Sequence, residues 1–146
     1  MARTQKDFTF DYELRLKDAG LIAADAAAQV GGVDKILDLG AGRVDGRVIA
    51  DITACEAASN DERYLIKTQF SNSATFASGV VGGPALDVGA LEVTKDTVDT
   101  AVGRYELPFT NELNGTVYRY MRIFTEVQGT IATGINYVAN AVLGVR

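Results

Sequence analysis

Alternation of apolar and polar side chains with a period of two residues dominates the second half of the chain. One face of residues 117–127 carries Val117, Arg119, Met121, Ile123, Thr125 and Val127. One face of the next segment carries Ile131, Thr133, Ile135, Tyr137, Ala139, Ala141 and Leu143. The residues between them, Gln128-Gly129-Thr130, are typical of a turn. The pattern therefore predicts a long β-hairpin whose strands lie in the core.

Shorter segments with the same alternation precede this pair. We expect strands at residues 35–39, 47–55, 64–70 and 102–109, the last closed by Pro108, because proline cannot donate to a central ladder. Composition predicts loops at 79–84 and 111–115. Many short strands with almost no helical period predict an all-β fold, a jelly roll or antiparallel β-sandwich, as a single domain over residues 12–146.

One segment resists this interpretation. Residues 19–30 are rich in alanine, which favours helix by intrinsic propensity. The segment has no clear polar face, and Gly31-Gly32 ends it. Either a loosely specified strand or a short helix is consistent with the sequence.

Composition narrows the classes of function. The 146 residues contain no histidine, which removes Ser-His-Asp and Cys-His constellations and histidine-ligated metal sites. The single cysteine, Cys55, lies in an apolar strand-like run, where a buried, inert thiol is the usual state. The net charge of −5 disfavours binding to nucleic-acid phosphates. No apolar run is long enough for a membrane span, and no signal peptide is evident, so we expect synthesis in a cytoplasm.

Three patterns carry candidate chemistry, and each has a simpler structural interpretation. The run Leu39–Gly46 resembles a dinucleotide fingerprint, but a strand rather than a helix follows it, which favours a glycine-rich turn. The acid pairs Asp61/Glu62 and Asp96/Asp99 are suited to glycoside cleavage or calcium binding, but they lie in turn-like sequence. We therefore predict no catalytic, cofactor or metal site. The third pattern is a set of strand tyrosines that serve either as core and interface residues or as a sugar platform: Tyr105, Tyr118, Tyr120 and Tyr137.

The first eleven residues have too few apolar groups to fold by themselves. Phe8 and Phe10 alternate with polar residues after a lead that contains Arg3 and Lys6. The segment is either an ordinary edge strand or an arm that docks on a neighbour. On the second interpretation, these four residues are the predicted partner contacts.

Two stretches give the chain a resemblance to a known family. The first stretch is Asp38-Leu39-Gly40 with its glycine turn, which leads into residues 47–55. The second stretch lies in the C-terminal part. It contains Tyr118-Arg119-Tyr120-Met121-Arg122-Ile123, then Val127-Gln128-Gly129-Thr130, and then a strand rich in small residues from Gly134 to Leu143. In these features the chain resembles the jelly-roll capsid cement, or decoration, proteins of tailed bacteriophages, of the Bordetella podovirus type. It departs from the family pattern at residues 72–96 and in its longer N-terminal segment.

The resemblance implies a structural virion protein on the capsid exterior, where it cements adjacent major capsid subunits and associates with itself as a homo-dimer or homo-trimer. We expect no enzymatic activity. The alternative is a carbohydrate-binding jelly-roll module displayed on the virion, which would use the tyrosines.

Overall fold

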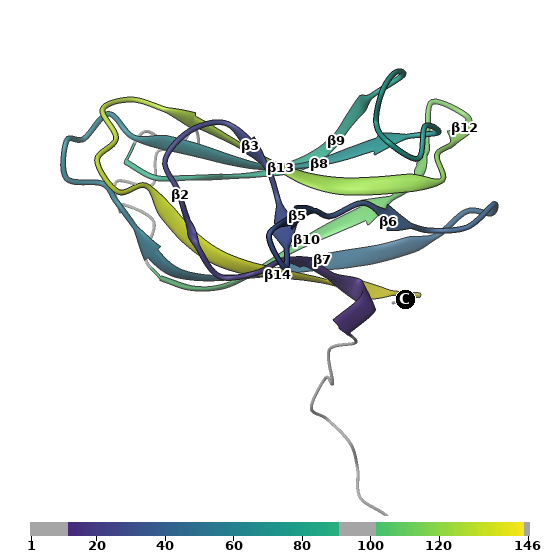
Figure 1. Ribbon diagram of the computed structural model, residues 1–146, viewed down its shortest axis with the longest axis horizontal. Coiled ribbons are helices and arrows are strands. Elements are labelled where there is room, and N and C mark those ends of the chain that lie inside the picture. The colour runs from purple at the N-terminus through teal and green to yellow at the C-terminus, as the bar shows by residue number, and fades with distance from the viewer. Residues whose placement is uncertain (1–11, 91–101, 145–146) are drawn as a thin grey trace, which may run out of the picture.

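Two antiparallel β-sheets face each other across one core (Figure 1). The computed structural model describes residues 12–90 and 102–144. The predicted all-β sandwich is confirmed. Its elements are η1 (Tyr12–Leu14), β1 (Arg15–Lys17), β2 (Leu21–Ile22), β3 (Ala26–Ala27), β4 (Gln29–Val30), β5 (Val33–Asp34), β6 (Leu37–Asp38), β7 (Asp45–Cys55), β8 (Arg63–Ser71), β9 (Val81–Val88), β10 (Gly103–Thr110), β11 (Glu112–Leu113), β12 (Thr116–Val117), β13 (Tyr120–Gln128) and β14 (Ile135–Leu143).

The order of the strands is that of a jelly roll. The first sheet runs β1-β14-β7-β10, with β2 also paired to β14. The second runs β3-β13-β8-β9, with β6 also paired to β13. The chain passes repeatedly from one sheet to the other, and the short strands β2 to β6 lie across the side of the sandwich in Figure 1. This interleaving of the two sheets is what distinguishes a jelly roll from a simple meander.

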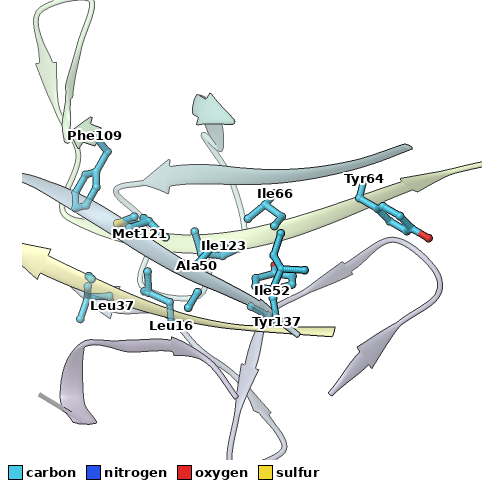
Figure 2. Close-up of a cluster of buried hydrophobic side chains, with 14 of the residues drawn as sticks. Leu16, Leu37, Ala50, Ile52, Tyr64, Ile66, Phe109, Met121, Ile123 and Tyr137 are labelled. Atoms are coloured by element: carbon cyan, nitrogen blue, oxygen red, sulfur yellow. The ribbon is translucent and has the colours of Figure 1, made fainter. Parts of the chain in front are cut away.

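The core lies between the inward faces that the alternation predicted. Met121, Ile123 and Thr125 of β13 and Ile135, Tyr137, Ala139 and Ala141 of β14 are buried. From β7 and β8 come Val48, Ala50, Ile52, Tyr64, Ile66, Thr68 and Phe70. Figure 2 shows how these side chains meet between the sheets. Across the core, the hydroxyls of Thr125 and Tyr137 form a hydrogen bond of 2.7 Å, so a buried polar contact joins the two sheets.

The predicted hairpin of residues 117–127 and 131–143 is wrong. β13 pairs with β8, β3 and β6, whereas β14 pairs with β7, β1 and β2. The two strands therefore lie in opposite sheets and face each other. The alternation of apolar and polar residues assigns each side chain to one face of its strand, but it does not specify which strand is the neighbour.

The segment 129–134 carries the chain across the sandwich and is fixed by two carboxylates. Glu56 Oε1 accepts the backbone N–H of Thr133 at 2.7 Å and of Gly134 at 2.8 Å. Asp61 accepts the N–H of Thr130 at 3.0 Å and its hydroxyl at 2.7 Å. Hydrogen bonds from the amides of Gly134 and Thr133 lower the pKa of Glu56, and those from the hydroxyl and amide of Thr130 lower the pKa of Asp61. The crossing is thus held by charged acceptors rather than by strand pairing.

Both prolines of the chain lie on edge strands at the same side of the sandwich. Pro84 lies in β9 and Pro108 in β10, and each of these strands pairs with one neighbour among the described residues. β10 continues to Thr110, two residues beyond Pro108. The loop predicted at residues 79–84 is wrong from Val81 onward: β9 begins there, and the register against β8 shifts beside Gly82 and Gly83. An irregular edge tolerates proline and glycine, because the missing N–H would face outward.

The alanine-rich segment forms no helix. Residues 19–30 contain β2, β3 and β4, and Gly31 and Gly32, both with positive φ, turn the chain into β5. Ala26 and Ala27 pair with β13, so pairing to a long strand overrides helix propensity. The strand expected at 35–39 is reduced to β6. The loop predicted at 111–115 contains β11, and Asn114 and Gly115 form the turn into β12.

Truncation of a core side chain tests the arrangement. Ile123 is fully buried, so we expect Ile123→Ala to lower the free energy of unfolding by roughly 2–5 kcal/mol. Val33 is 68% exposed, and Val33→Ala should change it by less than about 0.5 kcal/mol. Chemical denaturation of both variants measures the difference. Equal stabilities would show that Ile123 is not part of the core.

The crossing between the sheets has its own test at Gly134. Gly134 has a φ of 92°, and a Cβ there would overlap the carbonyl oxygen of Ile22. Gly134→Ala should therefore cost at least about 2 kcal/mol, combining left-handed strain with the overlap. Gly42 has no neighbour within 4 Å of a Cβ, so Gly42→Ala is the matched control and should be close to neutral. Thermal melts that place both variants together would contradict this path of the chain.

Candidate functional site

The candidate catalytic carboxylates within the described residues serve the backbone. Glu62 is fully buried and accepts the N–H groups of Ser59 at 2.8 Å and Asp61 at 3.1 Å. Asp61 fixes Thr130 as described above. No group of three or more potential metal ligands occurs within residues 12–90 and 102–144. Asp96 and Asp99 lie outside the described residues.

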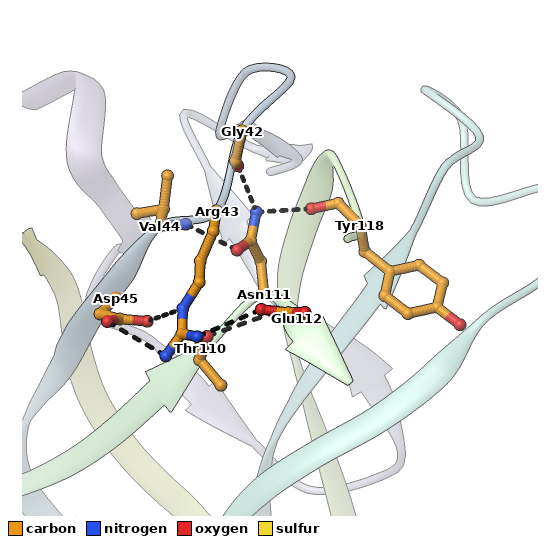
Figure 3. Close-up of polar contacts among 8 residues, drawn as sticks. All are labelled: Gly42, Arg43, Val44, Asp45, Thr110, Asn111, Glu112 and Tyr118. Carbon is orange, nitrogen blue, oxygen red and sulfur yellow. Dashed lines mark hydrogen bonds and ion pairs between the residues drawn. The ribbon is translucent and has the colours of Figure 1, made fainter. Parts of the chain in front are cut away.

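The glycine-rich turn of Leu39–Gly46 connects β6 to β7, as its simpler interpretation predicted, and a buried asparagine fixes it (Figure 3). Asn111 Oδ1 accepts the N–H of Val44 at 2.7 Å, and its Nδ2 donates to the carbonyls of Gly42 at 3.1 Å and Tyr118 at 2.9 Å. Arg43 lies over this clamp in ion pairs with Asp45 and Glu112, both 3.1 Å long. The side-chain amide of Asn111 thus links the glycine-rich turn to the segment around Tyr118, which is a structural role.

The four strand tyrosines do not form a row. Tyr137 is fully buried, with its hydroxyl on Thr125. Tyr105 packs against the core from β10, and Tyr120 lies half-buried at the start of β13. Tyr118 lines a depression of about 390 Å³ together with Asn72 and Ser73. The side chains of these two polar residues already bond the loop backbone, Asn72 to residues 117 and 119 and Ser73 to residues 75 and 77.

Three of the five large apolar side chains that are exposed within the described residues lie near the start of the described chain. Tyr12, Leu21 and Val33 are 65%, 55% and 68% exposed. We call the surface formed by residues 12–34 the N-terminal edge. It contains a groove of about 400 Å³ lined by residues 17–22 together with Ala26, Ala27, Gln29 and Gly32. This surface combines exposed apolar groups with a concave shape, which is characteristic of a contact region.

Lys17, beside this groove, is buried to 2% exposure. Its Nζ donates to the carbonyls of Tyr137 at 2.8 Å and of Asp18 and Gly20 at 3.0 Å, and lies 4.4 Å from the centre of the Tyr137 ring. Burial lowers the pKa of Lys17 to about 8, against a smaller opposing effect of Asp18. Sequence alternation gave no signal for this residue, because a register shift between Arg15 and Lys17 sets its orientation.

The outer faces of both sheets carry ion pairs between neighbouring strands. On the first sheet, Arg104 binds Asp51 with contacts of 2.7 and 3.0 Å, and Arg47 binds Glu106. On the second sheet the pairs are Arg63–Asp87, Lys67–Glu126 and Arg119–Asp38. Exposed pairs of this kind contribute little to stability. Each of them joins a basic side chain to a carboxylate of an adjacent strand within the subunit.

Two further sequence predictions concern the N-terminal partner contacts and the burial of Cys55. Arg3, Lys6, Phe8 and Phe10 lie outside the described residues. Cys55 is only partly buried, at the end of β7, so full burial of its thiol is a prediction that the structure corrects.

Comparison with known proteins places the chain in no group: no family model matches it, and no curated protein matches it. Among the described residues, no helix has the length and apolar character needed to cross a membrane.

The buried lysine makes stability depend on pH. The unfolded chain binds a proton at Lys17 up to its ordinary pKa of 10.5, whereas the folded chain releases it at about 8. Between these values the unfolded state holds more protons, so the contribution of Lys17 to stability rises with pH. Lys17→Met should remove this rise, and it should also lower stability at neutral pH by about 1–3 kcal/mol because three carbonyls lose their donor.

The measurement is denaturant unfolding of both proteins at several values between about pH 8 and pH 9.5. This range avoids the ionisation of tyrosines. Burial raises the pKa of Tyr64 and Tyr137 in the folded chain, so they shift stability in the opposite direction at higher pH. Parallel pH profiles for the wild type and Lys17→Met would show that Lys17 does not titrate in this range.

Proposed function

We propose that the protein is a structural component of a bacteriophage virion that binds the outer surface of the capsid and cements adjacent major capsid subunits. The resemblance of its glycine turn and C-terminal strands to phage cement proteins motivates this proposal, and the jelly-roll order of its strands agrees with it. The role requires no catalysis. On this proposal the protein resides on the exterior of the head, and its partners are the major capsid protein and further copies of itself, as a homo-dimer or homo-trimer.

The observation that carries the proposal is the distribution of exposed groups. Ion pairs link neighbouring strands on the outer faces of both sheets, whereas three of the five large exposed apolar side chains of the described residues lie on the N-terminal edge, which also contains a groove. This edge directly follows residues 1–11. The sequence of those residues supplies Phe8 and Phe10 beside Arg3 and Lys6. Apolar anchors among charged groups suit attachment to another protein.

Cementing is physically reasonable for a subunit of this size. A stable protein complex buries about 800 Å² on each partner. A weaker contact is sufficient on a shell, because one subunit that touches two capsid proteins binds the second at high effective concentration. Many copies then add their contacts over the whole head.

The carbohydrate-binding alternative has less support. The tyrosines that motivated it do not form a platform, and the polar groups beside Tyr118 are bonded within the loop. Specific binding on a glycan array, lost in Tyr118→Ala, would favour this alternative over cementing.

Deletion of the arm tests the preferred function. We expect removal of residues 2–11 to leave the fold intact, because the strands of both sheets and a large buried apolar core are supplied by residues 15–143. Attachment to heads stripped of this protein should weaken, or the oligomer should dissociate. Co-sedimentation with the heads and the solution mass of the oligomer measure these effects, and Phe8→Ala/Phe10→Ala in the full chain gives the matched substitution. Unchanged binding and mass in both variants would show that the arm makes no partner contact.

A further inference from the structure

Arg122 differs from most cations on the described surface. Seven basic side chains there form ion pairs with a carboxylate: Arg15, Arg43, Arg47, Arg63, Lys67, Arg104 and Arg119. Lys17 and Lys35 donate to backbone carbonyls. Arg122 forms no ion pair with any carboxylate of residues 12–90 and 102–144, and its Nε donates to the neutral side chain of Gln69 at 2.8 Å.

Two aromatic rings hold the guanidinium of Arg122 on the outer face of the second sheet. Its central carbon lies 4.5 Å from the centre of the Phe76 ring and 5.6 Å from that of Phe124. Arg122 and Phe124 lie on β13, and Gln69 is the direct neighbour of Arg122 on β8. Stacking and the Gln69 bond fix the plane of the group, whereas its two terminal nitrogens form no hydrogen bond with a described residue.

The position of Phe76 is held against local strain. Its φ of 58° is left-handed, which bulky residues rarely adopt. A network around two serines maintains the loop: Phe76 N–H donates to the carbonyl of Ser73, Ser73 Oγ accepts the N–H of Ala77, and Ser71 Oγ donates to the carbonyl of Ser78. The ring is 8% exposed, although it lies outside the main core. Strain that a surrounding network maintains is often found where a side chain is positioned for binding.

The charges of this face select the ligand. Its three other cations already have acidic partners in Asp38, Asp87 and Glu126, so Arg122 is an excess positive charge. A planar guanidinium with free terminal nitrogens binds a carboxylate through two parallel hydrogen bonds. An arginine stacked on aromatic residues is also common in the hot spots of protein interfaces. A nucleic acid is disfavoured by the net charge of −5.

We propose that Arg122, held between Phe76 and Phe124, is a docking site for an aspartate or glutamate side chain of a partner protein. The inference deepens the proposed function, because the partner it implies is an acidic surface of the capsid. It also gives the subunit a second contact, away from the N-terminal edge. A protein that bridges two capsid subunits requires two such surfaces.

The test uses the full chain and two probes. In the first, hexaglutamate is titrated while NMR follows the backbone N–H resonances of Gln69 and Phe76, which adjoin Arg122 and are present in both Arg122 variants. Hexalysine and a single-stranded DNA hexamer are the comparisons. We expect a saturable shift with hexaglutamate only. It should be lost in Arg122→Ala and reduced in Arg122→Lys, which keeps the charge without the planar fork.

In the second arm, attachment to heads lacking this protein is measured for the same variants. Arg122→Ala and Arg122→Lys should weaken attachment at least about tenfold, as expected for a hot-spot arginine. Phe76→Ala should weaken it less. Arg104→Ala, which removes a paired arginine from the outer face of the other sheet, is the matched control and should attach like the wild type. Thermal melts verify that every variant is folded.

The outcomes separate the two proposals. Failure of the wild-type protein to attach to heads overturns the cement function, while a hexaglutamate shift beside Arg122 still supports the carboxylate site. Wild-type attachment that Arg122 variants retain, without a hexaglutamate shift, overturns the site and leaves the cement function standing. A shift produced by the DNA hexamer and not by hexaglutamate overturns the assignment to carboxylate.

Discussion

The crossing at residues 129–134 is the constraint on which the rest of the sandwich depends. It places β13 and β14 in opposite sheets, so their inward faces form the centre of the core and the hydroxyls of Thr125 and Tyr137 can meet. Glu56 and Asp61 hold the crossing by accepting its backbone N–H groups. A tight hairpin turn would satisfy those groups within a ladder instead, and would bring the two strands into one sheet.

Acidic side chains in this protein act mainly as internal acceptors. Glu56, Asp61 and Glu62 bond backbone amides in the connections between strands, whereas acids on the sheet faces bond arginine or lysine of the adjacent strand. The buried amide of Asn111 serves the same purpose at the glycine turn. The connections of a jelly roll leave many backbone groups outside any ladder, and these side chains satisfy them.

Some surfaces of the subunit have features that limit contact with another protein, whereas two regions have features that favour it. Pro84 and Pro108 lie on the two edge strands of one side, which limits pairing of those edges with another chain. Cross-strand ion pairs occur on both outer faces. The N-terminal edge and the stacked Arg122 are the exceptions, and they lie on different parts of the molecule. Two separate contact regions suit a subunit that joins neighbouring proteins, which is the role we propose.

The amino-acid sequence is sufficient to predict the fold class and to assign the side chains of β7, β8, β13 and β14 to two faces, because both follow from a two-residue alternation with glycine between the segments. Ile123, Ile66 and Ala139 are buried on the faces that the alternation defines. Which strands are neighbours depends on tertiary contacts, since a strand shows the same alternation whether the next strand pairs with it or faces it across the core. The tertiary structure also decided the environments of Lys17 and Arg122. A register shift buries the lysine, and a loop far along the chain brings Phe76 over the arginine, so neither environment is encoded in the residues adjacent in sequence.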